Sequence, residues 1–315
     1  MRLSISIVVV LMYTFVARLA SAHPASGIVV DARGQVFFLD TGEPGGFRGV
    51  IWRIDSQANL TAVHDSGGHF LALDPDSVFG RADLGGWFRG KRTQWLERVA
   101  VPRSKSSLIQ ADGSPIVMGR DGGLYYASAE QLERAGVEQI ARLAADGTLR
   151  TPTPTLPAIA KKFGGIRGLA FGQGGDLYVA YENAVQKITS TGVTTLVDNI
   201  TVKDCDVDVP SEGRPPLLRG IAVDSRGVVY AAATGCHRVI RITGNKVETV
   251  LKAERPWSPT GIATFGDDVY VLEYTNPHGN AKEWRPRVRK IKRDATVATL
   301  VTISPADRAR VGAAR

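Results

Sequence analysis

The chain has 315 residues, of which 43% are hydrophobic and 22% charged, a composition typical of a folded globular protein that excludes a disordered one. Its formal net charge of +8 favours acidic partners or small anions without specifying either. After the first twenty residues no run is apolar enough, for long enough, to span a bilayer, so we expect no transmembrane segment in the mature chain.

The first 22 residues have the pattern of a secretory signal peptide. A short basic start at Arg2 precedes an uncharged apolar run over residues 4–16, and the sequence ASA at residues 20–22 is a small-residue cleavage pattern. We expect the mature chain to begin at His23 and to be secreted or periplasmic. An uncleaved membrane anchor is the alternative. Cleavage removes two arginines, including Arg18, and lowers the net charge from +8 to +6.

The remaining chain, residues 23–315, repeats one plan six times. Each unit has an apolar strand, a Gly/Asp-rich turn, a strand with an aromatic residue, a loop, a strand with a basic residue before an aliphatic one, and a fourth strand. The apolar strands begin at residues 27, 70, 115, 168, 220 and 261. The second-strand aromatic residues are Phe37, Phe79, Tyr125, Tyr178, Tyr230 and Tyr270. The third-strand basic residues, 44 to 54 positions apart, are Arg53, Arg98, Arg142, Lys187, Arg241 and Lys290.

This repeat predicts an all-β fold, a single six-bladed β-propeller domain with four-stranded blades over residues 23–315. A parallel β-helix would have shorter repeats, and a β-sandwich would not repeat so regularly. We expect the apolar first strands to line the inside of the ring. The basic third-strand residues should pack their stems against the blades while their charges reach water.

Two of the repeats resemble NHL repeats. They are residues 220–230 (GIAVDSRGVVY) with 237–242 (HRVIRI), and residues 168–178 (GLAFGQGGDLY) with 184–188 (AVQKI). The resemblance implies a propeller in a wider group that includes gluconolactonase-like hydrolases, strictosidine-synthase-like enzymes, a zinc-dependent lyase of peptide amidation and pure interaction modules. It therefore implies a fold more firmly than an activity.

One face of the ring is the expected working surface. Strand alternation places the loops between second and third strands, and the links from each fourth strand to the next blade, on the same face, which we call the top face. Several of these loops are enlarged, and long loops on a rigid scaffold usually carry function. Cys205 and Cys236 fall in two top-face loops of neighbouring repeats, so we expect them to form a disulfide.

The residue before each first strand should lie near the axis at the top face. These six residues are Ser26, His69, Ser114, Arg167, Arg219 and Thr260. His69 with Arg167 and Arg219 predicts an anion pocket in which His69 acts as general acid or base. Polar residues that simply plug the channel are the alternative. The acidic residues that hold a cation in gluconolactonase-like propellers, and the three histidines of the amidating lyase, are missing from this ring, so we expect no metal or other cofactor.

Further candidates come from the second-strand ends and the long loops. Of the six residues that lie three positions after a second-strand aromatic, three are candidates: Asp40, Tyr181 and Glu273. Tyr181 is a candidate ligand contact. Asp40 and Glu273 are candidate catalytic residues that could share a proton or a metal, or could form salt bridges with nearby arginines. Two top-face loops add candidate ligand contacts at Trp87, Arg89, His278 and Trp284.

Two functions remain open from the sequence. The first is a small-molecule enzyme, a lactonase-like hydrolase or a lyase, that binds a small organic anion in the central pocket of the top face. The second is a non-catalytic module that binds a protein, a glycan or another polyanion through the top-face loops. In either case we expect a monomer that does not bind nucleic acid.

Overall fold

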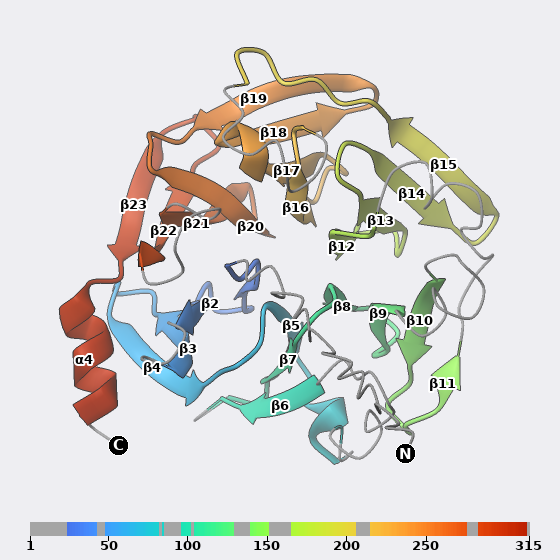
Figure 1. The fold of residues 1–315 in the computed structure, drawn as a ribbon. Coiled ribbons are helices and arrows are strands. Elements are labelled where there is room, and N and C mark those ends of the chain that lie inside the picture. The colour runs from blue at the N-terminus through green and yellow to red at the C-terminus, as the bar shows by residue number, and fades with distance from the viewer. Residues whose placement is uncertain are drawn as a thin grey trace, which may run out of the picture.

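The computed structural model describes residues 24–42, 48–81, 84, 96–101, 104–128, 139–150, 165–205, 215–275 and 283–313. The expected signal peptide and the candidates Trp87, Arg89 and His278 lie outside these residues. Six antiparallel sheets surround a central axis like the blades of a propeller (Figure 1). The predicted fold class is therefore confirmed. Within the described residues, no helix is long and apolar enough to cross a membrane.

Five blades have four strands, hydrogen-bonded in chain order from the axis outwards. Blade one contains β1 (Ile28–Val30), β2 (Val36–Gly42), β3 (Arg48–Ile54) and β4 (Leu60–Asp65). Blade three contains β8 (Ile116–Met118), β9 (Leu124–Ser128), β10 (Gln139–Leu143) and β11 (Leu149–Arg150). Blade four contains β12 (Gly168–Phe171), β13 (Leu177–Ala180), β14 (Val185–Thr189) and β15 (Gly192–Val197). Blade five contains β16 (Leu218–Val223), β17 (Val229–Ala233), the 3-10 helix η2 (Thr234–Cys236), β18 (Arg238–Thr243) and β19 (Lys246–Lys252). Blade six contains β20 (Trp257–Phe265), β21 (Asp268–Thr275), β22 (Pro286–Ile291) and β23 (Val297–Thr302).

Blade two departs from the repeated plan. Its three described strands are β5 (Phe70–Asp74), β6 (Leu96–Ala100) and β7 (Ser107–Ala111), hydrogen-bonded in the order β5-β7-β6. The prediction of a second strand at Phe79 is wrong, because this residue lies in the 3-10 helix η1 (Val78–Arg81). The Asp74 carboxylate accepts hydrogen bonds from the backbone N–H groups of Asp76 (3.3 Å) and Phe79 (3.1 Å), which turns the chain directly after β5.

The repeated aromatic and basic residues are direct cross-strand partners in the other five blades. In three blades the cation also lies over the aromatic ring: Arg142 over Tyr125 (6.0 Å), Lys187 over Tyr178 (5.7 Å) and Lys290 over Tyr270 (5.2 Å). The same cations pair with an aspartate near the start of the second strand: Asp121 (2.7 Å), Asp176 (2.7 Å) and Asp268 (2.6 Å). The pattern that identified the repeat is therefore a stabilising contact within these five blades.

Four inner strands carry a glycine where they approach the next blade. A Cβ at Gly27 would meet the Leu71 nitrogen at 2.9 Å, and one at Gly168 would meet the Arg219 carbonyl at 2.5 Å. A Cβ at Gly220 would lie 2.6 Å from the Cα of Gly261, and one at Gly261 would overlap the Ser26 carbonyl. The first-strand glycines of the repeat are thus required by close backbone packing between neighbouring blades.

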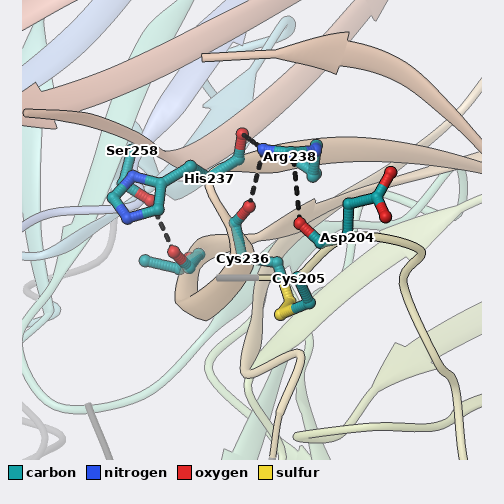
Figure 2. The surroundings of a disulfide bond; sticks show 7 residues. Asp204, Cys205, Cys236, His237, Arg238 and Ser258 are labelled. Carbon is teal, nitrogen blue, oxygen red and sulfur yellow. Dashed lines mark hydrogen bonds between the residues drawn. A yellow bond between two sulfur atoms is a disulfide. The ribbon is translucent and has the colours of Figure 1, made fainter. Parts of the chain in front are cut away.

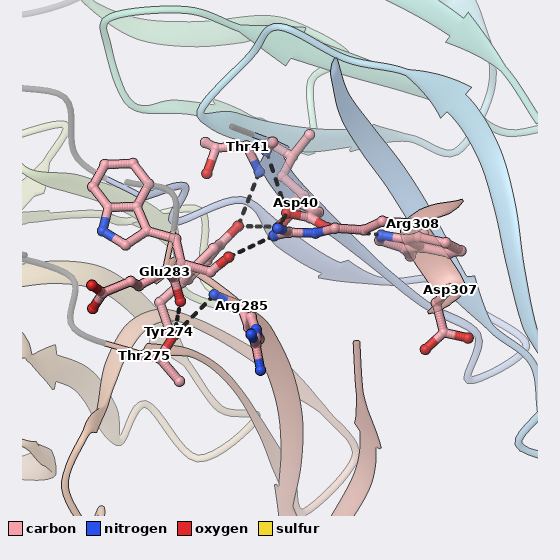
Figure 3. Close-up of polar contacts among 12 residues, drawn as sticks. Asp40, Thr41, Tyr274, Thr275, Glu283, Arg285, Asp307 and Arg308 are labelled. Carbon is pink, nitrogen blue, oxygen red and sulfur yellow. Dashed lines mark hydrogen bonds and ion pairs between the residues drawn. The ribbon is translucent and has the colours of Figure 1, made fainter. Parts of the chain in front are cut away.

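The ring closes between blade six and blade one without a shared strand in the described chain. A helix that the repeats did not predict, α4 (Pro305–Ala313), follows blade six and lies beside β4 (Figure 1). Its Arg308 donates hydrogen bonds to both carboxylate oxygens of Asp40, at 2.7 and 3.0 Å, and to the Trp284 carbonyl at 2.7 Å (Figure 3). The hydroxyl of Tyr274 in blade six donates to the Leu39 carbonyl of blade one at 2.7 Å. A buried polar cluster therefore joins the two ends of the ring.

Candidate functional site

A cavity of about 370 Å³ runs along the axis between the inner strands β1, β5, β8, β12, β16 and β20. Each strand contributes one aliphatic side chain, 5–7% exposed, to what we call the first level: Ile28, Leu71, Ile116, Leu169, Ile221 and Ile262. Among the described residues that line the cavity, the polar side chains are those of Ser26, Arg167 and Thr264. The prediction that apolar first strands line the inside is confirmed.

Arg167 is the charged side chain in this lining. It immediately precedes β12, where its backbone N–H donates to the Ala180 carbonyl at 2.8 Å. Its Nη2 donates to Glu182 Oε1 at 2.6 Å, which orients the guanidinium. Its Nε is buried and has no hydrogen-bond partner in the described part of the chain. A buried N–H without an acceptor is costly, so this donor is suited to an acceptor supplied by a ligand.

His69 flanks the same end of the cavity, in the loop before β5. Its backbone carbonyl accepts the N–H groups of Ser26 (2.9 Å) and Gly27 (3.0 Å), two residues of the cavity lining. Its Nδ1 lies 2.6 Å from Asp112 Oδ1. A carboxylate on one ring nitrogen fixes the orientation of an imidazole and directs the other nitrogen to proton transfer.

Asp112 was missed by the sequence analysis. It follows β7, and β7 pairs with β5 because blade two inserts a helix where the repeat predicts a strand. The residue thus reaches His69 through an irregularity of this one blade. No position in the repeat could have indicated it.

Arg219 and Thr260 contact the segment that leads into β1. Arg219, 8% exposed, donates from Nη1 to the Pro24 carbonyl at 3.4 Å. The hydroxyl of Thr260, which is fully buried, donates to the Ala25 carbonyl at 2.7 Å. These side chains hold the start of the described chain across blades five and six. A ligand contact by Arg219 stays a prediction.

Asp40 and Glu273 are fully buried, and each has its own arginine partners. Asp40 pairs with Arg308, whereas Glu273 accepts a hydrogen bond from Arg287 Nε and lies 3.6 Å from Arg289. Burial raises the pKa of both carboxyl groups, and the neighbouring guanidinium groups act in the opposite direction. The sequence analysis left open whether these carboxylates act together or form salt bridges with arginines. The structure shows the salt bridges.

Tyr181 and Trp284 lie in the core. Tyr181 is fully buried and donates its hydroxyl to Gln186 Oε1 at 3.1 Å. Trp284 is 3% exposed and packs in the hydrophobic cluster shared by blades one, two and six. Neither ring reaches the surface, so we assign both a packing role in place of the ligand contacts expected from the sequence.

The predicted disulfide between Cys205 and Cys236 is present, with the two Cα atoms 4.7 Å apart (Figure 2). It ties the link between blades four and five to the loop after β17. Arg238 reinforces the same junction by donating to the carbonyls of Cys236 at 3.0 Å and Asp204 at 3.2 Å. The two top-face loops are therefore joined covalently and by hydrogen bonds.

Comparisons of the sequence with protein-family models and with curated proteins give no match. Solved structures do match. The PQQ-bound aldose sugar dehydrogenase of Streptomyces coelicolor is 16% identical, over 84% of this chain and 94% of that one, with a TM-score of 0.50. A putative gluconolactonase is 17% identical over 89% and 92% of the two chains, with a TM-score of 0.49. Virginiamycin B lyase of Staphylococcus aureus is 14% identical over 90% and 87%, with a TM-score of 0.47.

At these identities the likeness shows the fold alone. The chain is a six-bladed β-propeller whose structural neighbours include gluconolactonase-like and lyase propellers. The propeller fold that the resemblance to NHL repeats implied is confirmed.

Proposed function

We propose that this chain is an exported propeller that binds a small organic anion at the Arg167 end of the axial cavity. The observation that carries the proposal is the buried Nε of Arg167, which lies in the cavity lining without a hydrogen-bond partner in the described part of the chain. An anion there would accept this N–H in a charge-assisted hydrogen bond, which is about twice as strong as one between neutral groups. The signal-like residues 1–22 and the disulfide support export, because disulfides persist in oxidising compartments.

The pairing of His69 with Asp112 supports hydrolase chemistry on a lactone. Asp112 would hold the Nδ1–H of His69 while Nε2 takes a proton from water, whose oxygen bonds to the lactone carbonyl carbon. The ring C–O bond then breaks, and the leaving oxygen receives the proton from Nε2. The product is a hydroxy acid whose carboxylate suits Arg167. Lactonase and lyase propellers share this fold, so both reaction classes are compatible with it.

Anion binding is tested by calorimetric titration with benzoate and its neutral isostere benzamide. We expect benzoate to bind at least about tenfold more tightly, since a hydrogen bond to a charged group contributes about 1.5–3 kcal/mol. Arg167→Gln should abolish this preference. Arg293→Gln is the matched control, because Arg293 is 74% exposed and pairs with Asp267 at 3.1 Å away from the cavity lining. Equal binding of the two probes by the unmodified protein would contradict the proposal.

A further inference from the structure

Backbone groups as well as side chains line the axial cavity. Each inner strand forms hydrogen bonds with a single neighbouring strand, on the side away from the axis (Figure 1). Successive residues of such an antiparallel edge strand direct their N–H and C=O groups alternately towards the partner strand and away from it. Every second residue of an inner strand therefore presents one donor and one acceptor to the axis.

The register identifies these axial residues in β12. The N–H of Gly172 donates to the Asp176 carbonyl at 2.9 Å, and the pairing with β13 continues through Ala170. Leu169 and Phe171 alternate with these hydrogen-bonded positions, so their N–H and C=O groups face the axis. The same alternation gives the axial residues of β1, β8 and β16, which are Ile28, Val30, Ile116, Met118, Ile221 and Val223.

An axial backbone group can bind a partner from outside its own sheet. The carbonyl of Val223 accepts the hydroxyl of Thr264, in the neighbouring blade, at 3.1 Å. Buried N–H and C=O groups need such partners, and the pairing with β13 does not use the axial groups of Leu169 and Phe171. These two residues lie about 6.7 Å apart along an extended strand. An extended peptide repeats its own N–H and C=O groups at this interval, so one edge of a peptide can pair with both residues at once.

We propose that the axial cavity binds a short peptide with a free C-terminus, whose carboxylate lies at Arg167 and whose backbone pairs with the axial edge of β12. This inference rests on the proposed function, because Arg167 supplies the contact for the carboxylate. Arg167 directly precedes β12, so the bound peptide runs antiparallel to this strand. Its last residue then lies beside Leu169 and its third-last residue beside Phe171. A cavity of about 370 Å³ is large enough for a ligand of this size.

The first test is calorimetric titration of the full chain without its signal peptide against N-acetyltriglycine and its depsipeptide analogue. The analogue has ester oxygens in place of the three amide N–H groups and keeps the same carboxylate and nearly the same shape. We expect it to bind at least about fivefold more weakly, because two of the lost N–H groups would face β12. Equal Kd values for the two probes overturn the inference.

Gluconate tests whether hydroxyl groups serve the axial edge as well as amides do. A hydroxyl can also bond to a backbone N–H or C=O, but a polyol lacks the fixed spacing of donors and acceptors along a peptide edge. We therefore expect gluconate to bind more weakly than N-acetyltriglycine at the same pH and ionic strength. Tighter binding of gluconate overturns the inference.

A proline at an axial position tests the pairing from the side of the protein. Phe171→Pro removes an N–H that faces the axis and no hydrogen bond to β13, and proline is tolerated at such positions of edge strands. Phe171→Val is the matched control, because it also removes the ring but keeps the N–H. We expect Phe171→Pro to bind N-acetyltriglycine about two- to tenfold more weakly than Phe171→Val, with equal binding of benzoate.

Leu169→Pro with its control Leu169→Val repeats this comparison if Phe171→Pro does not fold. Equal tripeptide binding by a folded proline variant and its valine control overturns the inference. If neither proline variant folds, the depsipeptide titration of the unmodified protein decides.

Arg167→Gln and the C-terminal amide of N-acetyltriglycine separate the failure of this inference from the failure of the proposed function. If the tripeptide and its ester analogue bind equally and Arg167→Gln removes the binding of both, the strand pairing is rejected and the anion site stands. If the ester analogue binds more weakly but neither Arg167→Gln nor amidation of the C-terminus changes the Kd, the pairing stands and the anion site is rejected.

Discussion

Two separate parts of blade two position His69. The residue itself lies in the loop before β5, and its partner Asp112 directly follows β7. Its Nδ1 faces Asp112 at 2.6 Å, and its side chain is 26% exposed, so the ring is oriented yet accessible. This combination suits a general base better than the fully buried Asp40 and Glu273.

The proposed chemistry predicts a loss of turnover without a loss of stability at His69. His69→Asn should lower hydrolysis of an aliphatic γ-lactone at least about 100-fold, which is the usual contribution of a general base, and leave the Tm and benzoate affinity nearly unchanged. A pH-stat assay beside thermal unfolding measures both. Asp112→Asn should lower the rate and alter its pH profile, because the ring loses its orienting carboxylate. If the unmodified protein does not hydrolyse the lactone, hydrolase chemistry is rejected and anion binding remains to be judged by titration.

At the residue scale, the repeat predicted where the candidate side chains lie but not which residues they would pair with. It placed His69, Arg167 and Arg219 at one end of the axis, and the structure finds Arg167 in the cavity lining. Their partners Asp112 and Glu182 could not be inferred, since pairing depends on how individual loops fold. The catalytic and ligand-binding roles of these residues stay predictions.

At the scale of the strands, the glycines in or directly before four inner strands set how closely neighbouring blades can pack. At Gly220 the atoms that a Cβ would meet belong to the backbone of blade six, namely the Cα of Gly261 and the carbonyl of Thr260. Backbone atoms cannot move aside as a flexible side chain can. The fit between blades five and six therefore depends on the absence of a side chain here.

Gly220→Ala should lower the free energy of unfolding by about 1–3 kcal/mol, the usual cost of overpacking a tight contact. Gly67→Ala is the control, because no atom lies within 4 Å of a Cβ built there, and it should change stability by less than about 0.5 kcal/mol. Urea unfolding of both variants measures the difference. A Gly220→Ala protein as stable as Gly67→Ala would show that the blades can separate at little cost.

The strands of five blades were predictable because their aromatic and basic residues recur at fixed positions and pair directly across the ladder. The second strand of blade two was predicted wrongly, because hydrogen bonds to Asp74 form η1 at the point where the pattern indicates a strand. Helix α4 could not be predicted from the repeat, because it lies after the last repeat unit.

At the scale of the whole molecule, the seam between blades six and one is held by Arg308 and Asp40, both nearly or fully buried. Arg308→Met would leave the Asp40 carboxylate buried without its cation, so we expect the free energy of unfolding to fall by about 3–5 kcal/mol. Adding Asp40→Asn should restore part of this loss, because a neutral amide needs no counter-ion.

Arg310→Met is the control for this prediction, since Arg310 belongs to the same helix but is 78% exposed. It should change stability by less than about 0.5 kcal/mol in the same urea titration. Similar stability of the Arg308 and Arg310 variants would show that α4 does not hold the seam.

Because every described blade is built from consecutive strands, the order of the blades around the ring is the order in which the ribosome makes them. A nascent chain can complete each blade before the next one emerges. Arg308, however, is synthesised after all six blades. Until it emerges, Asp40 lacks the guanidinium with which it pairs in the folded chain. The contacts between blades six and one that do not need α4, such as Tyr274 with Leu39, can form earlier. The last part of the seam is therefore completed late in biogenesis, when this arginine has been synthesised.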